Sequence, residues 1–345
     1  MRTSLLAAVL LLSVAAVAQD VHVKVSPSVK TGIEGTNEFP TIQNALDHHP
    51  FAGPGGRVFI EIEPGTYHER VIVTQNHQNV TLLGMGAKPE DTVITAGMNA
   101  KMAGGTFFTE TAEINGDGFE ADNLTFENSA GNTGPAVAAA VRADRAVFKH
   151  CRFLGHQDTL FADYGRQYYV DSYITGVVDY IFGAGTAVFE RDVLESNGPG
   201  FVTAQSRTAA DQTSGYVILN SKVTSAIDQN AGPLDPSTPG AKSAASAKKA
   251  ISLGRPWRPY ARVIFINTEL SADVSPAGWN NWGKASNEKT AYYAESGNTG
   301  PGAKSGDRVK WAHQLSPAEV QMYLPAQFLK GKDNWNPVAE AARLP

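Results

Sequence analysis

The chain has 345 residues, of which 42% are hydrophobic, and its formal net charge at neutral pH is −5. A chain of this length can form one large domain with a sizeable core. A net negative charge does not indicate a basic surface that would bind nucleic acid or an anionic membrane. A polyanionic partner would have to be held by a few basic side chains at its binding site.

The first residues, MRTSLLAAVLLLSVAAVAQD, have the pattern of an export signal. An arginine precedes an apolar run, and the small residues Ala16-Val17-Ala18 stand before a cleavage point at Gln19 or Asp20. The run is shorter than the roughly 20 apolar residues that span a bilayer. We therefore expect residues 1–19 to be a signal peptide and residues 20–345 to form a single domain. The mature protein would be secreted, into the periplasm or the medium.

A short amphipathic helix is predicted near the N-terminus, in FPTIQNALDHH. Phe39, Ile42, Ala45 and Leu46 fall on one face of this helix. An apolar helix face suits the end of a β domain, because open strand edges invite pairing with other chains. We expect this helix to cover one end of the fold.

Short strand-like runs dominate the following residues, and helical periods are scarce. Runs such as NVTLLG, NLTFEN, AVFKHCRF, YYVDSYITG and AVFERDVL are rich in β-branched and aromatic residues. Comparable points recur about every twenty residues, which is longer than the 8 to 12 residues typical of tight hairpins in a sandwich or barrel. We therefore predict an all-β fold, a single-stranded parallel β-helix (solenoid) whose stacked coils share one core. A sandwich or barrel is the alternative.

Cys151 is the only cysteine, so an intramolecular disulfide is impossible. It lies in the alternating run AVFKHCRF, without a helix start or a basic pair that would lower the pKa of its thiol. We interpret it as a small buried hydrophobic residue rather than a nucleophile or a zinc ligand.

Two acidic residues stand in apolar surroundings near the middle of the chain. Asp158 follows Gln157 in GHQDTL, and Asp179 lies within VVDYIFG. Their separation is close to one coil of the predicted solenoid, so the carboxylates would lie on adjacent strands, ~4.8 Å apart. Two carboxyl groups that close do not both ionise cheaply in apolar surroundings, so one should keep its proton near neutral pH. The pair would supply an acid and a nucleophile or base.

Residues 225–250, SAIDQNAGPLDPSTPGAKSAASAKKA, have no apolar period and are rich in Ala, Ser, Pro, Gly and Lys. We predict a long mobile loop. Insertions in a solenoid often emerge on the binding face, so the loop could flank a cleft. It could equally be a plain surface excursion.

The stretch LGRPWRPY offers a partner for the acid pair. Arg255 carries a permanent charge in a planar fork that can hold an ionised carboxylate in one orientation. Pro256 stiffens the adjacent chain, and Trp257 presents a flat apolar face on which a sugar ring can stack. Alone, this tripeptide is weak support for a site, because most arginines are solvated and most tryptophans belong to a core.

A second helix is predicted near the C-terminus, in LSPAEVQMYL. Ser316 is its N-cap, Pro317 occupies the first helical position, and Glu319 completes a capping box. We expect this helix to cover the other end of the fold.

Taken together, these stretches resemble the pectin methylesterase (pectinesterase) family, a class of right-handed parallel β-helix enzymes. The resemblance runs from about residue 35 to about residue 340, in the family's order. The stretches that carry it are GTYHERV, NVTLLGMG, GDGFEADNLTFENSAG, GHQDTLFADYGRQYYVDSYITGVVDYIFGAGTAVFE, LGRPWRPYARVIF, AGWNNW and YYAESGNTGPGA.

The resemblance implies an esterase that acts on methylated galacturonate units of pectin. By similarity, Asp179 would be the nucleophile that forms an acyl-enzyme, and Asp158 the general acid and base. Arg255 would orient Asp179, and the Gln157 amide would donate to the oxyanion. No metal or organic cofactor is implied, and the partner would be the pectin polymer, bound by a monomer.

The resemblance also implies an aromatic substrate cleft. The matching positions are Phe161, Phe182 and Trp257. Phe161 and Phe182 would serve equally well as ordinary core residues, so their sequence positions leave both interpretations open.

Two positions depart from the family pattern. The family places a second amide donor in a QAVAL stretch, and the aligned residue here is Pro135, which cannot donate. His156 stands where relatives often carry an aromatic residue, and we expect it to pack. Consecutive strand residues face opposite ways, so Gln157 and Asp158 can enter one cleft only if the strand ends or bends there.

Three other functions remain possible on sequence alone. A glycoside hydrolase on the same fold also uses paired acids, although an arginine clamped to one acid and an amide beside the other suit ester chemistry better. A polysaccharide-binding solenoid without turnover would explain Pro135. A calcium-dependent lyase would need further acids, and no such cluster is evident in the sequence.

Overall fold

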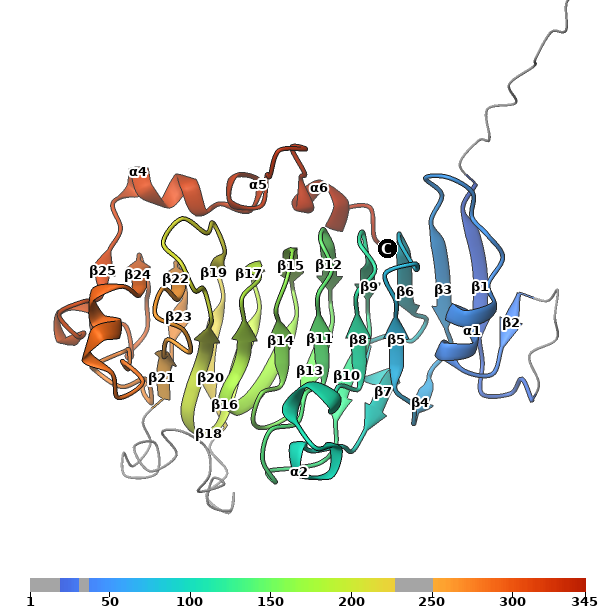
Figure 1. Cartoon of the computed structure of the whole chain (residues 1–345), viewed down its shortest axis with the longest axis horizontal. Coiled ribbons are helices and arrows are strands. Elements are labelled where there is room, and N and C mark those ends of the chain that lie inside the picture. The colour runs from blue at the N-terminus through green and yellow to red at the C-terminus, as the bar shows by residue number, and fades with distance from the viewer. Residues whose placement is uncertain (1–18, 31–36, 227–250) are drawn as a thin grey trace, which may run out of the picture.

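The structure is a computed structural model that describes residues 19–30, 37–226 and 251–345, and it forms an elongated coil of parallel strands (Figure 1). The strand pairs among these residues are all parallel. The predicted signal peptide, apart from Gln19, lies outside the described residues, and so does the predicted loop from residue 227 onward.

The strands form two sheets. The twelve-stranded sheet follows the order β2 (Glu38–Phe39), β1 (Val21–Val25), β3 (Val58–Ile62), β6 (Val80–Gly84), β9 (Glu120–Asp122), β12 (Ala146–Lys149), β15 (Arg166–Val170), β17 (Thr186–Glu190), β19 (Gly215–Leu219), β22 (Arg262–Ile266), β24 (Tyr292–Ser296) and β25 (His313–Gln314). We call it the long sheet.

The second sheet is folded, because two of its strands continue from one side of the coil to the next. Its order is β4 (Gly65–Tyr67), β7 (Thr92–Ala96), β10 (Thr125–Asn128), β13 (Arg152–Leu154), β16 (Tyr173–Gly183), β14 (Leu160–Ala162), β11 (Ala139–Val141), β8 (Ala112–Ile114) and β5 (Val71–Val73). β18 (Val193–Gln205) joins it through β16 and also pairs with β20 (Lys222–Ser225) and β21 (Ile251–Gly254), while β23 (Glu269–Leu270) pairs with β20. We call it the folded sheet.

The register confirms the predicted coil length. In the long sheet, Val147 lies beside Tyr168, and Tyr168 lies beside Val188. Each step in the middle of the chain therefore spans about twenty residues and returns to the same point one strand further along. The predicted parallel β-helix is confirmed, and the sandwich and barrel are wrong.

The interior is packed with aromatic rings that stack from coil to coil. The ring centroids of Phe148 and Tyr169 are 4.9 Å apart, those of Tyr169 and Phe189 are 4.6 Å apart, and all three residues are buried. Such pairs stabilise beyond the area they bury, by about 0.5–1.5 kcal/mol each. Cys151 is buried in this core, as predicted, and burial raises the pKa of its thiol.

Single residues in the left-handed conformation turn the chain from the long sheet into the folded sheet. His150, Asp171, Arg191, Asn220 and Asn267 each follow a long-sheet strand with φ between 49° and 56°. One left-handed residue reverses the side-chain alternation and bends the chain. Repeating this bend on successive coils keeps their strands aligned.

The N-terminal end is covered as expected. Helix α1 (Ile42–His48) has Thr41 as its N-cap and buries Ile42, Ala45 and Leu46 against the first strands. Phe39, in β2, is buried beside it. The remaining short helices lie in connections between strands: α2 (Ala100–Ala103), η1 (Pro89–Asp91), η2 (Thr106–Phe108), η3 (Ala285–Lys289) and η4 (Ser305–Asp307).

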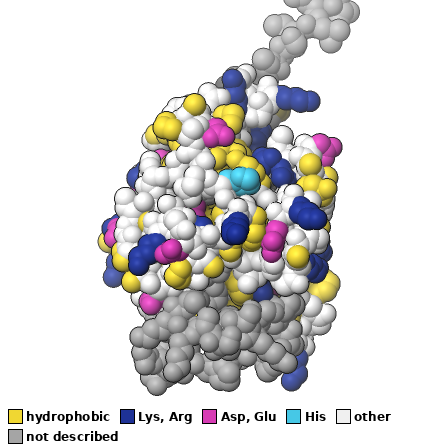
Figure 2. Space-filling model, turned by 90° about the vertical axis from the view of Figure 1, so that its left-hand side faces the viewer, with side chains coloured by type: hydrophobic (Ala, Val, Ile, Leu, Met, Phe, Trp, Pro, Cys, Tyr) yellow, Lys and Arg dark blue, Asp and Glu magenta, His cyan; other side chains and the backbone are white. Residues whose placement is uncertain are grey.

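The C-terminal helices lie along the outer face of the long sheet, not across the end of the coil as expected (Figure 1). Helix α4 (Pro317–Val320) has the predicted N-cap Ser316 and the capping box with Glu319. From there η5 (Gln321–Tyr323), α5 (Pro325–Phe328) and α6 (Pro337–Ala341) run back along the outer face of the long sheet (Figure 1). Their buried side chains Tyr323, Leu329 and Trp335 pack against outward-facing long-sheet residues such as Val188. Seen from this end, acidic and basic side chains are interspersed (Figure 2).

A row of polar side chains lies inside the corner between the two sheets. The Asp192 Oδ1 atom accepts from the Ser172 backbone N–H at 2.7 Å, and the Ser221 Oγ atom accepts from the Asp192 backbone N–H at 3.0 Å. Asp192 is fully buried, and its Oδ2 atom has no hydrogen-bond partner among the described residues. Burial therefore raises the pKa of the Asp192 carboxyl well above its usual range.

Asp192 should make the stability of the protein depend on pH. Its folded-state pKa is raised, so stability should fall as pH rises above the unfolded value of about 4. Asp192→Asn keeps the shape and removes the ionisation, so we expect it to be the more stable form at pH 7, by about 1–3 kcal/mol. Thermal melting from pH 4 to 8 measures this: the two curves should converge near pH 4. A difference that does not change with pH, or one that the exposed control Asp211→Asn reproduces, would contradict the assignment.

Candidate active site

The folded sheet bends at Gln157 and Asp158, where a strand end or a bend is expected from the sequence. Gln157 pairs with Pro135 on one side and with Val178 on the other in isolated parallel bridges, and the regular strand β14 begins only at Leu160. Asp158 has φ +62°, in the left-handed region, and its N–H donates to Val178 O at 3.0 Å. The predicted bend is confirmed.

Asp179 occupies a similar irregularity on the next coil. It has φ +52° within β16, where the register with β18 shifts between Val178 and Ile181. Because Gln157 pairs with Val178, the residues that follow them, Asp158 and Asp179, lie on neighbouring rungs. Both acids therefore leave the regular strand alternation at the same point of the coil. A residue other than glycine is strained in this conformation, and Asp179 adopts it inside strand β16 rather than at a regular turn of the coil.

The Arg255 guanidinium makes a bidentate contact with the Asp179 carboxylate. It directly follows β21, and its backbone N–H donates to Thr203 O at 2.9 Å. The Nε atom donates to Asp179 Oδ1 at 2.8 Å, and Nη2 donates to Oδ2 at 2.6 Å. Arg255 is 1% exposed and Asp179 is 5% exposed. A buried bidentate pair of this kind fixes both position and charge.

Two aromatic rings sandwich the Arg255 guanidinium. Its central carbon lies 3.9 Å from the centroid of the Phe201 ring and 3.8 Å from that of the Trp282 ring. Cation–π contact stabilises the charge where water is excluded. Sequence reasoning assigned no role to either residue, although Trp282 ends AGWNNW, a stretch that carried the family resemblance.

Burial and neighbouring charges affect the pKa values of the two acids differently. Burial raises the pKa of Asp158 well above its usual range, the neighbouring Asp179 charge adds to this rise, and Arg255 opposes it. Burial also raises the pKa of Asp179, but the charge and hydrogen bonds of Arg255 counteract the rise. The pKa of Asp158 is therefore raised more than that of Asp179, which favours a proton on Asp158 over one on Asp179.

An aromatic group lies next to the acid pair and outside the main core. Phe161 and Phe182 are register neighbours with ring centroids 4.5 Å apart, and each is 4% exposed. The half-buried Trp257 lies 6.0 Å from Phe182, and the exposed Phe107, which sequence reasoning missed, lies 5.0 Å from Phe161. Both phenylalanines are nearly buried, yet they belong to a separate cluster that Trp257 and Trp282 border.

The two departures from the family pattern fall within this region. Pro135 lies directly opposite Gln157 on the preceding coil, and the following residue, Ala136, donates its N–H to Gln157 O at 3.0 Å. Pro135 itself offers no N–H. His156 is half-buried, and burial lowers its pKa.

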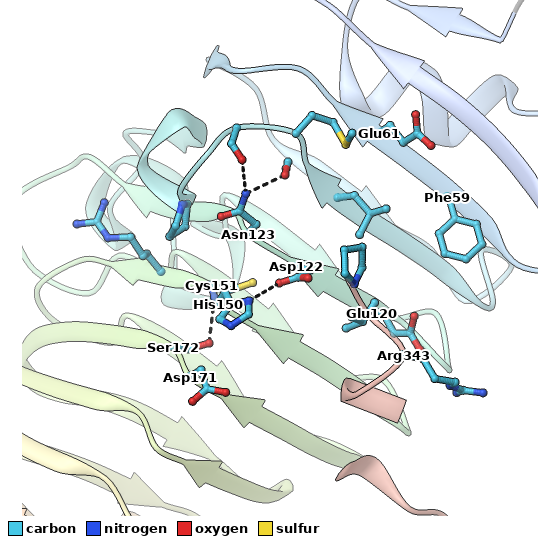
Figure 3. A pocket seen from close by; sticks show the side chains of 18 of the residues that line it. Phe59, Glu61, Glu120, Asp122, Asn123, His150, Cys151, Asp171, Ser172 and Arg343 are labelled. Carbon is cyan, nitrogen blue, oxygen red and sulfur yellow. Dashed lines mark hydrogen bonds and ion pairs between the residues drawn. The ribbon is translucent and has the colours of Figure 1, made fainter. Parts of the chain in front are cut away.

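A large hollow of the described surface lies elsewhere. It has a volume of about 1770 Å³ and opens on the outer face of the long sheet near the C-terminus (Figure 3). Its buried acids are already paired, Glu120 with Arg57 at 3.1 Å and Asp122 with His150 at 3.1 Å. It therefore lacks the unequal acid pair of the candidate site. Among the described residues, no group of three or more His, Cys, Asp or Glu is arranged to hold a metal ion.

The family model for Pectinesterase matches residues 28–332. The chain belongs to the pectinesterase family. It is 36% identical to pectinesterase 31 of Arabidopsis thaliana, over 87% of this chain and 92% of that relative. Some other Arabidopsis relatives are longer, and the chain spans about half of their length.

Solved structures agree with this assignment. Carrot pectin methylesterase matches with a TM-score of 0.79 and 30% identity, over 96% of this chain and 98% of that one. A pectin methylesterase in complex with a hexasaccharide matches with a TM-score of 0.71 and 28% identity, over 93% and 99% of the two chains. The protein is thus a carboxylic ester hydrolase with the expected right-handed parallel β-helix fold. Within the described ranges, no helix is long and apolar enough to cross a membrane.

Trp282 should set the pKa of Asp179 through Arg255. Replacing it with leucine removes one face of the aromatic sandwich and loosens the guanidinium, so the pKa of Asp179 should rise. Trp282→Phe should restore most of the effect. The measurement is a ¹³C NMR titration of labelled aspartate carboxyls, with Trp257→Leu as a control in the neighbouring aromatic group. An unchanged Asp179 titration in Trp282→Leu would show that Arg255 needs no such support.

Proposed function

We propose that this pectinesterase-family protein hydrolyses methyl esters of galacturonate units in pectin, giving pectate and methanol through an acyl-enzyme on Asp179. The observation that carries the proposal is the buried bidentate contact between Arg255 and Asp179, one rung from a carboxyl that keeps its proton. Family membership and the hexasaccharide bound by a structural relative support a polymeric sugar ester as the substrate.

In the first half of the reaction, the ionised Asp179 attacks the ester carbonyl carbon. The bond between that carbon and the methoxy oxygen breaks, and Asp158 gives its proton to the departing methanol. The galacturonate carbonyl is then bonded to Asp179 as an anhydride. Arg255 keeps Asp179 charged and oriented before the attack.

In the second half, Asp158 acts as a base. Now ionised, it takes a proton from a water molecule, which attacks the galacturonate carbonyl and releases the sugar acid. Asp179 leaves as a carboxylate, and Asp158 holds the proton again. The site therefore returns to its starting charge without a metal or an organic cofactor.

Gln157 is suited to stabilise the oxyanion in both halves. Its amide has N–H donors that a carbonyl oxygen gaining negative charge can accept from, and removing one such donor typically costs ~10²–10³ in rate. Pro135 cannot supply a second amide, so this chain relies more heavily on Gln157 than relatives with two amides would. Gln157 is buried beside Asp158 at the bend.

The aromatic group supplies the substrate contacts. Trp257 is half-buried and offers a ring face for an apolar sugar face, with Phe161 and Phe182 forming the floor beneath. A substrate in a plant cell wall also fits export of the mature chain, for which residues 1–19 have the sequence pattern.

Asp179→Asn should lower the rate of methanol release from highly methylated pectin by about 10³-fold or more, because an amide is a poor nucleophile. The control is Asp171→Asn, which changes another left-handed aspartate, one that pairs with Arg191 on the surface. That variant should keep the rate within about twofold. An Asp179→Asn protein that retains a tenth of the wild-type rate would remove Asp179 from the mechanism.

Product analysis in the same assay distinguishes the esterase from a glycoside hydrolase. The proposal expects methanol without new reducing ends, since the chain is not shortened. New reducing ends without methanol would replace the esterase by a glycosidase.

A further inference from the structure

Three arginines differ from the other described arginines in their ion pairing. Among the described residues, the other arginines each pair with a carboxylate, whereas Arg207, Arg258 and Arg262 do not. Arg207 and Arg258 lie in the turns that follow β18 and β21, and Arg262 is the first residue of the long-sheet strand β22. Arg258 is exposed and its guanidinium lies 4.7 Å from the Trp257 ring centroid. The other two line a cavity.

This cavity has a volume of about 400 Å³, within the usual range for small-ligand sites. Its basic side chains are Arg207, Arg262, Lys289 and His313, and no acidic residue lines it. Lys289 and His313 are exposed at its rim. Its lining residues Tyr292 and His313 belong to β24 and β25, at the left-hand end of the coil in Figure 1. We call it the arginine cavity.

The two arginines of the cavity are held in place by backbone carbonyls. Arg207 is 4% exposed; its Nε atom donates to Tyr260 O, and its Nη1 atom donates to Gln212 O at 2.9 Å. Arg262 donates through Nη1 to Thr213 O at 3.1 Å. Neither Nη2 group has a protein acceptor among the described residues, so each guanidinium keeps an N–H edge for a further partner.

Burying two like charges side by side is unfavourable without a counter-charge. Burial, together with the neighbouring Arg262 charge, lowers the pKa of Arg207 to about 10, and burial also lowers the pKa of Arg262. At neutral pH both stay charged. A bound anion would offset this cost, and a planar carboxylate fits the guanidinium fork better than a spherical ion does.

The rest of the lining suits a sugar. The Tyr260, Tyr292 and Tyr323 rings line the cavity, and Tyr292 stacks on His313 with centroids 4.7 Å apart. Tyrosine combines a flat apolar face with a hydroxyl, which matches the mixed surface of a sugar ring. An anion site alone would need no such rings.

The cavity also shares a loop with the candidate active site. Trp257 N–H donates to Gln205 O at 3.1 Å, while the Gln205 side-chain oxygen accepts from the backbone N–H groups of Arg207 and Arg262, at 2.9 Å each. Gln205 thus joins the backbone at Trp257 to the backbone at Arg207 and Arg262.

We propose that the arginine cavity is a second carbohydrate site, separate from the acid pair, which binds the free carboxylate of a de-esterified uronate unit. The identity of the ligand rests on the proposed function, since pectate is the product of that reaction. The neutral ester would lack the charge that the two guanidiniums recognise. The site would hold already processed chain close to the cleft.

Arginine footprinting tests the site residue by residue. The wild-type protein is treated with phenylglyoxal, and the modification of Arg262 is measured by peptide mass spectrometry. Trigalacturonate should protect Arg262, while the neutral trigalacturonamide should not. Arg191, a surface arginine paired with Asp171, is the internal control and should react equally in all samples.

Three results would overturn the proposal. One is no protection of Arg262 by either trigalacturonate or inorganic phosphate, which would leave the two arginines with only a structural role, linking neighbouring turns. The second is equal protection by trigalacturonamide, because recognition would then not depend on the carboxylate. The third is protection by inorganic phosphate but not by trigalacturonate, which would make the cavity an anion site that rejects the sugar.

Variants provide an independent readout. Calorimetry at low ionic strength should show trigalacturonate binding about tenfold weaker for Arg262→Gln, with partial recovery in Arg262→Lys, which keeps the charge but loses the fork. Arg191→Gln is the matched control and should bind like wild type. Thermal melting checks that Arg262→Gln is folded. Equal affinity of folded Arg262→Gln and wild type would also reject the site.

The two proposals fail separately. Methanol release by the wild-type protein tests the esterase reaction and does not involve Arg262 protection. A protein that releases methanol but shows no protection loses only the second site. A protein that shows protection but releases no methanol keeps the uronate site and loses the proposed reaction.

Discussion

The structure of the candidate site depends on one buried ion pair, Arg255 with Asp179. A buried pair contributes little net stability, because desolvating both partners offsets most of their attraction. The pair matters because Arg255 allows Asp179 to carry a negative charge in buried surroundings. One guanidinium can balance one negative charge, and two carboxyl groups compete for it on adjacent rungs. The solenoid spacing thereby produces two chemically different acids from identical side chains.

The proposed mechanism keeps this balance at every stage. Before attack the negative charge is on Asp179. In the acyl-enzyme Asp179 is part of a neutral anhydride, and Asp158 carries the charge instead. The site therefore never holds two negative charges in an apolar environment. The Phe201 and Trp282 rings on either side of Arg255 keep the guanidinium fixed while the charge moves between the acids.

Much of this arrangement could be predicted from local sequence. The recurrence of strands at about one coil placed Asp158 beside Asp179, and the alternation rule required the bend that Asp158 adopts. The cap of α4 could be predicted because a capping box depends on residues three positions apart. Cys151 was recognisable as a buried residue from its alternating neighbours.

The remaining features depend on contacts between distant residues, which no local pattern records. Trp282 and Phe201 meet on Arg255 only through stacking of separate coils. The path of the C-terminal helices over the long sheet depends on an apolar outer face that alternating strands merely suggest. The isolation of Arg207 and Arg262 from carboxylates is visible only when all neighbours are known. In the sequence both look like ordinary solvated arginines.

The central claim is that Asp158 is neutral while Asp179 is ionised near neutral pH. Infrared difference spectroscopy of wild type against Asp158→Asn at pH 6 to 7 measures this directly, because a protonated carboxyl and a carboxylate absorb at different frequencies. The account predicts that the substitution removes a protonated-carboxyl band that shifts on deuteration. Loss of carboxylate bands alone would mean that both acids are ionised together, and the account would be wrong.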